Sequence, residues 1–261
     1  IYDIRSQSIA PDGSILRDRF VNDIVPTSRF DPIAKQLIDQ YPGENQNLTP
    51  FGERPGSNFF TQRDASVDVD QFDIRLDHRI SDNASIFGSV SVIEERKIQS
   101  PPLPGDLDAG GFGGQSEDNK SRNAMMSYTK IWSPSIISES RVAFTRLVTT
   151  RVQANADKNS FAELGFGGID PFTTNNGGLM ALAPDGYSNV GGSNWLPTQE
   201  YNNVWDFIQN ISVNRGSHAF KFGAEFRQIR FPFFQVPSPR GQFSFNRNQS
   251  KLPSIGDSGD G

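Results

Sequence analysis

The sequence predicts an all-β fold: a partial antiparallel transmembrane β-barrel of about six strands, with long extracellular loops and one short helix. Two observations predict it. Apolar residues occupy every second position in several segments, and short connections between these segments alternate with long ones. Barrel strands cross a bilayer in alternating segments of about ten residues, joined by short periplasmic turns and longer extracellular loops. Both observations therefore favour a barrel wall.

The composition supports strands and excludes several classes of function. The 261 residues include 24 Gly, 17 Pro and 21 Phe, which favours strands joined by turns. A formal net charge of −5 argues against a broad nucleic-acid surface. The absence of cysteine excludes disulfides and thiolate metal sites. No run of about 18 apolar residues occurs, so we expect no transmembrane helix.

The clearest alternation lies in residues 71–80 and 218–227. Successive side chains of a strand point to opposite faces, so each segment has one apolar and one charged face. The side chains expected to face lipid are Phe72, Ile74, Leu76, Phe220, Phe222 and Phe226. Those expected to face the lumen are Asp73, Arg75, Asp77, Arg79, Lys221, Glu225 and Arg227. Their mixed signs favour cross-strand ion pairs over a selective substrate path.

The connections divide the chain into three regions. Tight turns are predicted at 81–83, 133–135 and 214–217, and long Gly-, Pro- and Asn-rich stretches at about 99–120, 153–202 and from 232 onward. We therefore expect an extracellular loop region at 1–67, six barrel strands at 68–232 and the start of a further extracellular loop at 233–261. A short helix near 31–41 is predicted by Asp31 as N-cap and Pro32 in the first turn.

The longest loop holds the candidate substrate-binding residues. Aromatic side chains beside amides and a carboxylate can bind a sugar or a peptide, and loops carry much of binding function. The candidates are Trp195, Tyr187, Asn194 and Asp185. The alternative is that Trp195 packs the loop over the barrel mouth.

Other motifs indicate structure rather than chemistry. His78 and His218 have no metal-ligand spacing, so we expect interfacial aromatic roles for both. Trp132 and Tyr128 are expected near the inner membrane interface, and an aromatic cluster at 231–234 near the outer one. The Gly-rich segments at 110–114, 165–168 and 189–195 are interpreted as flexible loops, because no amphipathic helix is expected after them. Neither Glu94–Glu95 nor the run 68–73 matches a calcium loop. We expect no enzyme activity, metal or cofactor.

Five stretches in order carry a family resemblance: "VPTSRFDPIAKQLIDQYP", "DQFDIRLDHRISDNASIFGSVS", "SYTKIWSPSIISESRVAFTRL", "SNWLPTQEYNNVWDFIQNISVNRGSHAFKFGAEFRQIRF" and "SPRGQFSF". With these the chain resembles the β-barrel part of TonB-dependent outer-membrane receptors, especially the Oar-like group. The resemblance spans most of residues 20–246. It implies a location in the bacterial outer membrane, an N-terminal plug domain, energy supplied by the inner-membrane TonB complex, and capture of a scarce or bulky nutrient. The plug and the TonB-contacting segment are expected outside this chain, which we interpret as a fragment.

Two other classes of protein remain open from the sequence. One is a passive porin or an outer-membrane adhesin on a similar barrel. The other is a soluble extracellular β-sandwich that binds glycans. A sandwich would have to pack its apolar strand faces on each other, and its long loops would not all lie on one side.

Overall fold

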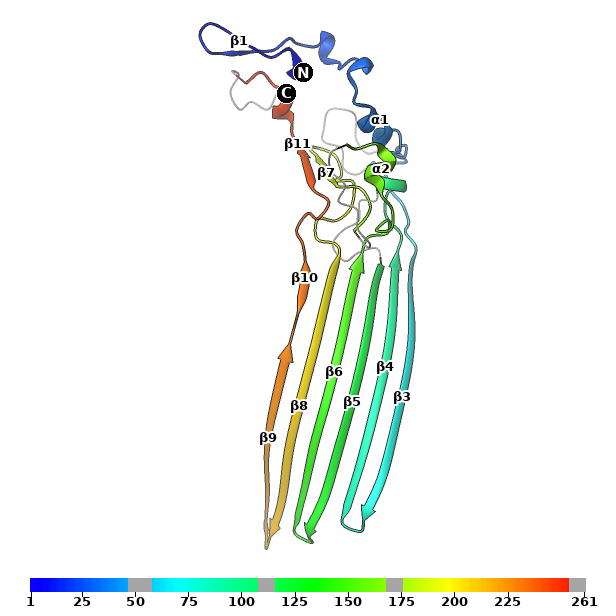
Figure 1. Ribbon diagram of the computed structural model, residues 1–261, viewed down its shortest axis with the longest axis vertical. Helices are drawn as coiled ribbons and strands as arrows, with labels where there is room; N and C mark the ends of the chain where they lie inside the picture. Colours follow the sequence, from blue (N-terminus) through cyan, green and yellow to red (C-terminus); the bar gives the residue numbers. More distant parts are fainter. Residues whose placement is uncertain (47–57, 108–115, 168–175, 254–261) are drawn as a thin grey trace.

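The structure, a computed structural model, describes residues 1–46, 58–107, 116–167 and 176–253. A tall antiparallel sheet forms most of it, and the connecting loops gather at one end of that sheet (Figure 1). Within the described residues, the long strands are β3 (Ala65–Ser81), β4 (Ala84–Gln99), β5 (Ser116–Ser133), β6 (Ile136–Val152), β8 (Thr198–Arg215) and β9 (His218–Arg230). The predicted all-β fold is confirmed.

The short strand β10 (Phe233–Gln235) continues the ladder of β9 along β8. Arg230 lies opposite Asn203 and Phe233 lies opposite Glu200, so the register is the same on both sides of the break. Pro232 causes the break, because it has no N–H to donate. Its carbonyl still accepts a hydrogen bond from the Tyr201 N–H at 2.9 Å.

Three tight turns close the hairpins at the end of the sheet away from the loops (Figure 1). The turn residues between paired strands are 82–83, 134–135 and 216–217, as the sequence predicts. In the last turn Gly216 has φ of +62°, a conformation that glycine adopts without steric cost. Sequence neighbours therefore pair as neighbours across the whole sheet, and the two edges are β3 and the β9–β10 ladder.

The remaining elements belong to the loop end. They are helices α1 (Pro32–Ile38) and α2 (Ser160–Leu164), strands β1 (Ser8–Ile9), β2 (Ile15–Leu16), β7 (Ala181–Pro184) and β11 (Gln242–Phe245), and 3-10 turns at Ile4–Ser6, Val21–Asp23, Thr27–Arg29, Gly105–Leu107 and Arg247–Ser250. No helix among the described residues has the length and apolar character needed to span a membrane.

Helix α2 is an element that the sequence interpretation missed. Asn159 caps it by accepting a hydrogen bond from the Ala162 N–H, and Gly165 ends it with φ of +79°. Gly165 was interpreted as part of a flexible loop, but it is the C-terminal cap of a helix of five residues. The expectation of one short helix is therefore corrected to two in the described part of the chain.

The buried apolar core lies in the loops, outside the sheet. It joins α1, the turn at Gly105–Leu107, α2 and the segment around β7, and consists of Leu37, Leu107, Phe161, Leu164, Leu179, Met180 and Val190. Phe161 also packs against Phe166, with ring centroids 5.5 Å apart. These long connections thus form a packed cap, while the sheet leaves large apolar side chains exposed.

Candidate functional site: two sheet faces and the outer loops

One face of the sheet, called the apolar face below, carries the side chains that were expected to face lipid. Residues paired across an antiparallel ladder lie on the same face, so the register defines rows that cross the sheet. The row from β3 to β9 that starts at Leu76 ends at Phe226 and contains Gly88, Met126, Val142 and Phe207. Leu76 is 74% exposed and Phe226 63% exposed. These apolar side chains have no protein partner covering them in the described structure.

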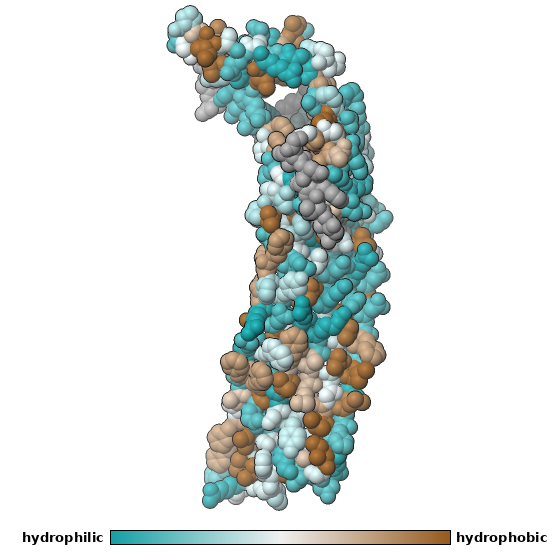
Figure 2. Space-filling model, viewed as in Figure 1, coloured by the Kyte–Doolittle hydropathy of each residue, from teal (hydrophilic) through white to brown (hydrophobic). Residues whose placement is uncertain are grey.

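Aromatic rings form a chain along this face. Phe144 lies 4.7 Å from Trp205, and Phe207 lies 6.1 Å from Trp205 and 6.2 Å from Phe226, measured between ring centroids. In the view of Figure 2, apolar side chains are concentrated on the part of the sheet next to the tight turns, and polar ones predominate above them. Such a band matches the outward-facing apolar belt of membrane barrels.

The opposite face, called the polar face, carries the charges that were expected in the lumen. Arg227 pairs with Asp206 across β8 and β9 at 2.9 Å, and with Glu225 along its own strand at 2.7 Å. Arg75 pairs with Asp77 along β3 at 2.8 Å and stacks over the ring of Phe87. Two charges bond elsewhere: Arg79 to the turn residue Asp82 at 2.9 Å, and Asp73 to the hydroxyl of Ser91 at 2.5 Å.

The expected ladder of cross-strand ion pairs is therefore only partly present. Among the candidate charges in the described structure, the cross-strand ion pair is Arg227–Asp206, and the others run along a strand or into a turn. The reason is position. β3 and β9 lie at opposite edges of the sheet, so the charges of one cannot reach those of the other.

A stronger charge network lies on the polar face at its loop end, and the sequence interpretation missed it. Glu117 on β5 binds Arg151 on β6 at 2.6 Å and Lys97 on β4 at 3.5 Å. Arg151 also pairs with Glu200 on β8, and Lys97 pairs with Glu95 at 2.8 Å. The tight turn at 134–135 sets the register of β5 and β6, so it could have placed Glu117 opposite Arg151. Lys97 lies opposite Glu117 across strands joined by a long connection, so no turn signal gave that contact.

The loop candidates divide into two places beside the parallel pair of β7 and β11. Asn194 donates a side-chain hydrogen bond to Gln242 at 2.8 Å, and the carbonyl of Trp195 accepts one from the Gln235 amide at 3.0 Å. Asp185 lies 3.7 Å from Arg247, next to the turn that carries Tyr187. The rings of Trp195 and Tyr187 stay 47% and 78% exposed. Both are thus available for contact with a ligand.

Arg240 organises these loops and was not singled out in the sequence. Its side chain is only 4% exposed. It donates to the carbonyls of Ser193 at 2.5 Å and Leu196 at 3.1 Å, and to the side chain of Asn176 at 2.9 Å. A single buried guanidinium therefore ties the loop before β8 to the loop before β11.

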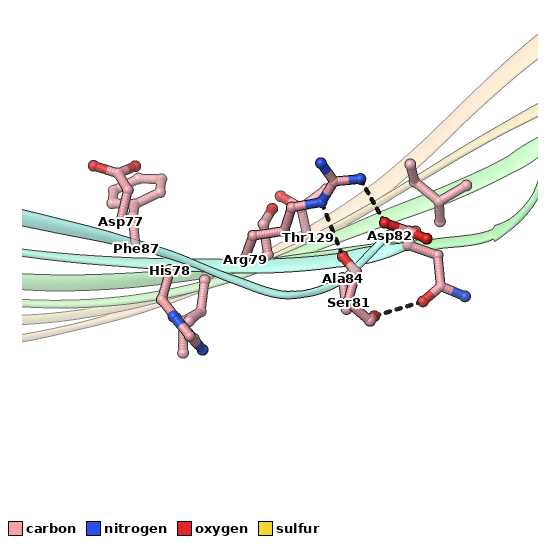
Figure 3. Close-up of a pocket in the computed structure, with 12 residues that line it drawn as sticks. Asp77, His78, Arg79, Ser81, Asp82, Ala84, Phe87 and Thr129 are labelled. Atoms are coloured by element: carbon pink, nitrogen blue, oxygen red, sulfur yellow. Dashed lines mark hydrogen bonds and ion pairs between the residues drawn. The ribbon is translucent and has the colours of Figure 1, made fainter.

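A hollow at the β3–β4 turn shows how the two faces separate (Figure 3). Asp77 and Phe87 extend to one side of the strands, and His78 extends to the other. His78 belongs to the apolar face, opposite Ile86, and His218 lies 6.0 Å from Phe220 between ring centroids. Within the described ranges no group of three His, Cys, Asp or Glu side chains could hold a metal.

One family model, described as "Outer membrane beta barrel domain", matches residues 1–258. The chain belongs to this family. No curated protein and no solved structure matches it. Membership places the protein in the bacterial outer membrane and makes the antiparallel sheet part of a barrel wall.

For an outer-membrane barrel, the position of the connections has a simple explanation. In lipid every backbone polar group needs a partner, so strands must continue as paired hairpins across the bilayer. The three tight turns lie at one end of the sheet and the packed loops at the other (Figure 1). This is the arrangement of periplasmic turns and extracellular loops in barrels of this kind.

Proposed function

We propose that the chain is the wall and capture-loop part of a TonB-dependent outer-membrane receptor that takes up a scarce or bulky nutrient. The observation that carries the proposal is the packed loop cap at one end of the sheet, which holds Trp195 and Tyr187 exposed. A passive pore does not need a loop cap with its own buried core. The family resemblance described above supports the same proposal, with a plug domain and the TonB complex as partners and a nutrient as ligand.

In this proposal the apolar face contacts lipid and the polar face lines the lumen. Its support is the chemistry of the two faces. A lipid-facing surface must be apolar over about 25 Å, whereas a lumen filled by water or a plug accepts charge. The charge network of Glu117, Arg151 and Lys97 then lies inside the barrel near its outer mouth, where it stiffens the wall below the capture loops.

Conductance across a planar bilayer separates the proposed receptor from a passive porin. The protein would be purified from the outer-membrane fraction and inserted into the bilayer without denaturation. We expect no steady current, because a plug closes the lumen of a receptor. A stable open channel would contradict the receptor and favour the porin.

Ligand capture can be tested by tryptophan fluorescence. Oligosaccharides, peptides and iron-chelating compounds would be titrated into the detergent-solubilised protein, and the Trp195→Phe variant would be titrated beside it. We expect a ligand that changes the emission of the parent protein and binds the variant at least about tenfold more weakly. Trp132→Phe, at the far end of the sheet, is the matched control and should bind as the parent does. Equal binding by both variants would remove Trp195 from the capture site.

Acyl-chain quenching tests the orientation of the faces. Trp205 lies on the apolar face, in the same row as Phe144 and one row toward the tight turns from Arg146. In liposomes of brominated phosphatidylcholine we expect its emission to be quenched, and the quenched fraction to fall in the Trp205→Phe variant. An unchanged quenched fraction would show that the apolar face does not contact lipid.

A further inference from the structure

A row of cations crosses the apolar face where its apolar band ends. Arg122 on β5 lies directly opposite Arg146 on β6. Arg146 lies opposite Asn203 on β8, which lies opposite Arg230 on β9. Lys120 stands two residues beyond Arg122 on the same face. Four cations therefore share one face of neighbouring strands, on the side of the band that leads to the loops.

Protein groups neutralise this row only in part. Arg122 pairs with Glu94 at 2.5 Å. Arg146 stacks over the ring of Tyr201 at 5.4 Å from its centroid. Among the described residues, no carboxylate lies within ion-pair distance of Lys120, Arg146 or Arg230. Like charges placed directly opposite each other destabilise a sheet, so the Arg122–Arg146 pair favours an anion between the two side chains.

The acidic side chains of this face do not fill that role: Glu94 lies directly opposite Lys120 but pairs with Arg122. Asp118 is already 3.8 Å from Arg96. Asp68 and Asp70 lie on β3, at the far edge of the sheet. The positive charge without a carboxylate partner is thus confined to β5, β6 and β9.

A shallow groove of about 490 Å³ begins in the next row toward the turns. Gly88 and Ala124 form its floor because their side chains are small, and Ile74, Phe144 and Trp205 stand along it. The next row is two residues away along each strand, about 7 Å. An apolar chain in this groove would bring its polar end to the cations.

We propose that this surface binds a phosphorylated lipid of the outer leaflet, with its phosphate groups on Arg122, Arg146, Lys120 and Arg230 and an acyl chain in the groove. Guanidinium groups bind phosphate through paired hydrogen bonds, and an apolar groove joined to a cationic row matches the two parts of such a lipid. A soluble phosphate would satisfy the cations only. The inference rests on the proposed contact of the apolar face with lipid.

The test uses the detergent-solubilised protein from the outer-membrane fraction and diphosphoryl lipid A in maltoside micelles. Bound lipid is counted by native mass spectrometry over a lipid titration. For Arg146→Gln/Arg230→Gln we expect the apparent affinity to fall at least about tenfold, because two cations that attract the anionic headgroup are removed. The control Arg79→Gln/Lys221→Gln removes the same charge from the polar face and should bind as the parent does.

Two further probes identify the ligand chemistry. A neutral glycolipid with the same acyl chains should bind at least about tenfold more weakly than diphosphoryl lipid A, and inorganic phosphate should not compete at millimolar concentration. Equal loss of affinity in both double variants, equal binding of the neutral glycolipid, or full competition by inorganic phosphate would each overturn the proposal. Quenching of Trp205 by brominated lipid is measured separately. Intact quenching without a phosphate preference would refute this inference alone and leave the proposed orientation standing.

Discussion

At the scale of single residues, buried and partly buried arginines hold separate loop segments together through hydrogen bonds. Arg240 bonds two backbone carbonyls that have no strand partner, so it replaces secondary structure where the chain is irregular. Asp3 and Arg29 similarly join the first residues to the turn at Thr27–Arg29, with contacts of 2.6 and 2.7 Å. Removing either kind of contact should loosen one loop and leave the sheet intact.

Arg240→Ala should destabilise the loops around residues 193–197 by about 2–3 kcal/mol, because buried hydrogen bonds from a charged donor are lost and their acceptors left unpaired. Hydrogen exchange measured by mass spectrometry should show faster exchange in residues 176–198 and unchanged exchange in β5 and β6. Arg247→Ala is the control. Its ion pair with Asp185 is exposed, so the change should stay below about 1 kcal/mol. Equal effects of the two substitutions would contradict the role given to Arg240.

The contact between Asp3 and Arg29 predicts a pH dependence of the N-terminal loop. The side-chain hydrogen bond from Arg29 lowers the pKa of Asp3 below its usual value of 3.8. A carboxyl with a lowered folded pKa stabilises the fold above its unfolded pKa, and this stabilisation is lost as the pH falls through the folded pKa. Exchange in residues 1–30, corrected for intrinsic rates, should therefore rise between pH 5 and pH 2.5. Asp3→Asn should show a smaller rise, and an identical rise would refute the assignment.

At the scale of elements, each long strand presents one apolar and one polar face. Ala124 on β5 and Ala143 on β6 are neighbours at nearly the same depth but lie on opposite faces. Ala143 shares its row of the polar face with Asp206, whereas Ala124 shares its row of the apolar face with Val90 and Phe144. When the same substitution is made at these two positions, the difference in the free energy of unfolding therefore shows mainly which face of the sheet contacts lipid.

Ala124→Arg should lower the free energy of unfolding in liposomes by about 1–2 kcal/mol, because an arginine on the lipid face, one row inside the cationic border of the apolar band, is still poorly solvated. Ala143→Arg should cost less than about 1 kcal/mol, since Asp206 lies on the same face. Urea unfolding followed by the loss of the folded band on a gel gives both values. A larger cost at Ala143 than at Ala124 would reverse the assignment of the faces.

At the scale of the whole molecule, the sheet and the loops are stabilised by different environments. The loops have a buried apolar core of their own. The strands expose their apolar side chains. In the outer membrane, where the family places the protein, lipid can cover them. The strength of the wall therefore depends on continuous strand pairing in lipid.

A closed barrel should resist unfolding in cold detergent. Protein extracted from the outer-membrane fraction is expected to migrate differently on a denaturing gel before and after boiling. The boiled sample is the unfolded reference, and a soluble protein run beside it should show no such shift. A single band under both conditions, from protein recovered in the soluble fraction, would contradict a barrel and favour the glycan-binding sandwich.

The alternating pattern was enough to predict the six long strands, their two faces and their order, although β5 and β8 begin a few residues earlier than predicted. Alternation is a local property, so Phe72, Ile74 and Leu76 could be placed on one face without knowledge of any partner. The tight turns also follow from local chemistry, and they make the two strands of each hairpin pair. The helix at Pro32–Ile38 was predictable for the same reason, because Asp31 caps it within three residues.

The contacts between side chains across the sheet and between loops could be read only from the folded protein. The network around Glu117 and Arg151 depends on register, in which a shift of one residue would move every side chain to the other face. The cap formed by α2, β7 and Arg240 depends on contacts between loops more than 40 residues apart. Such contacts leave no periodic signal in the sequence, because their partners are chosen by the folded chain as a whole.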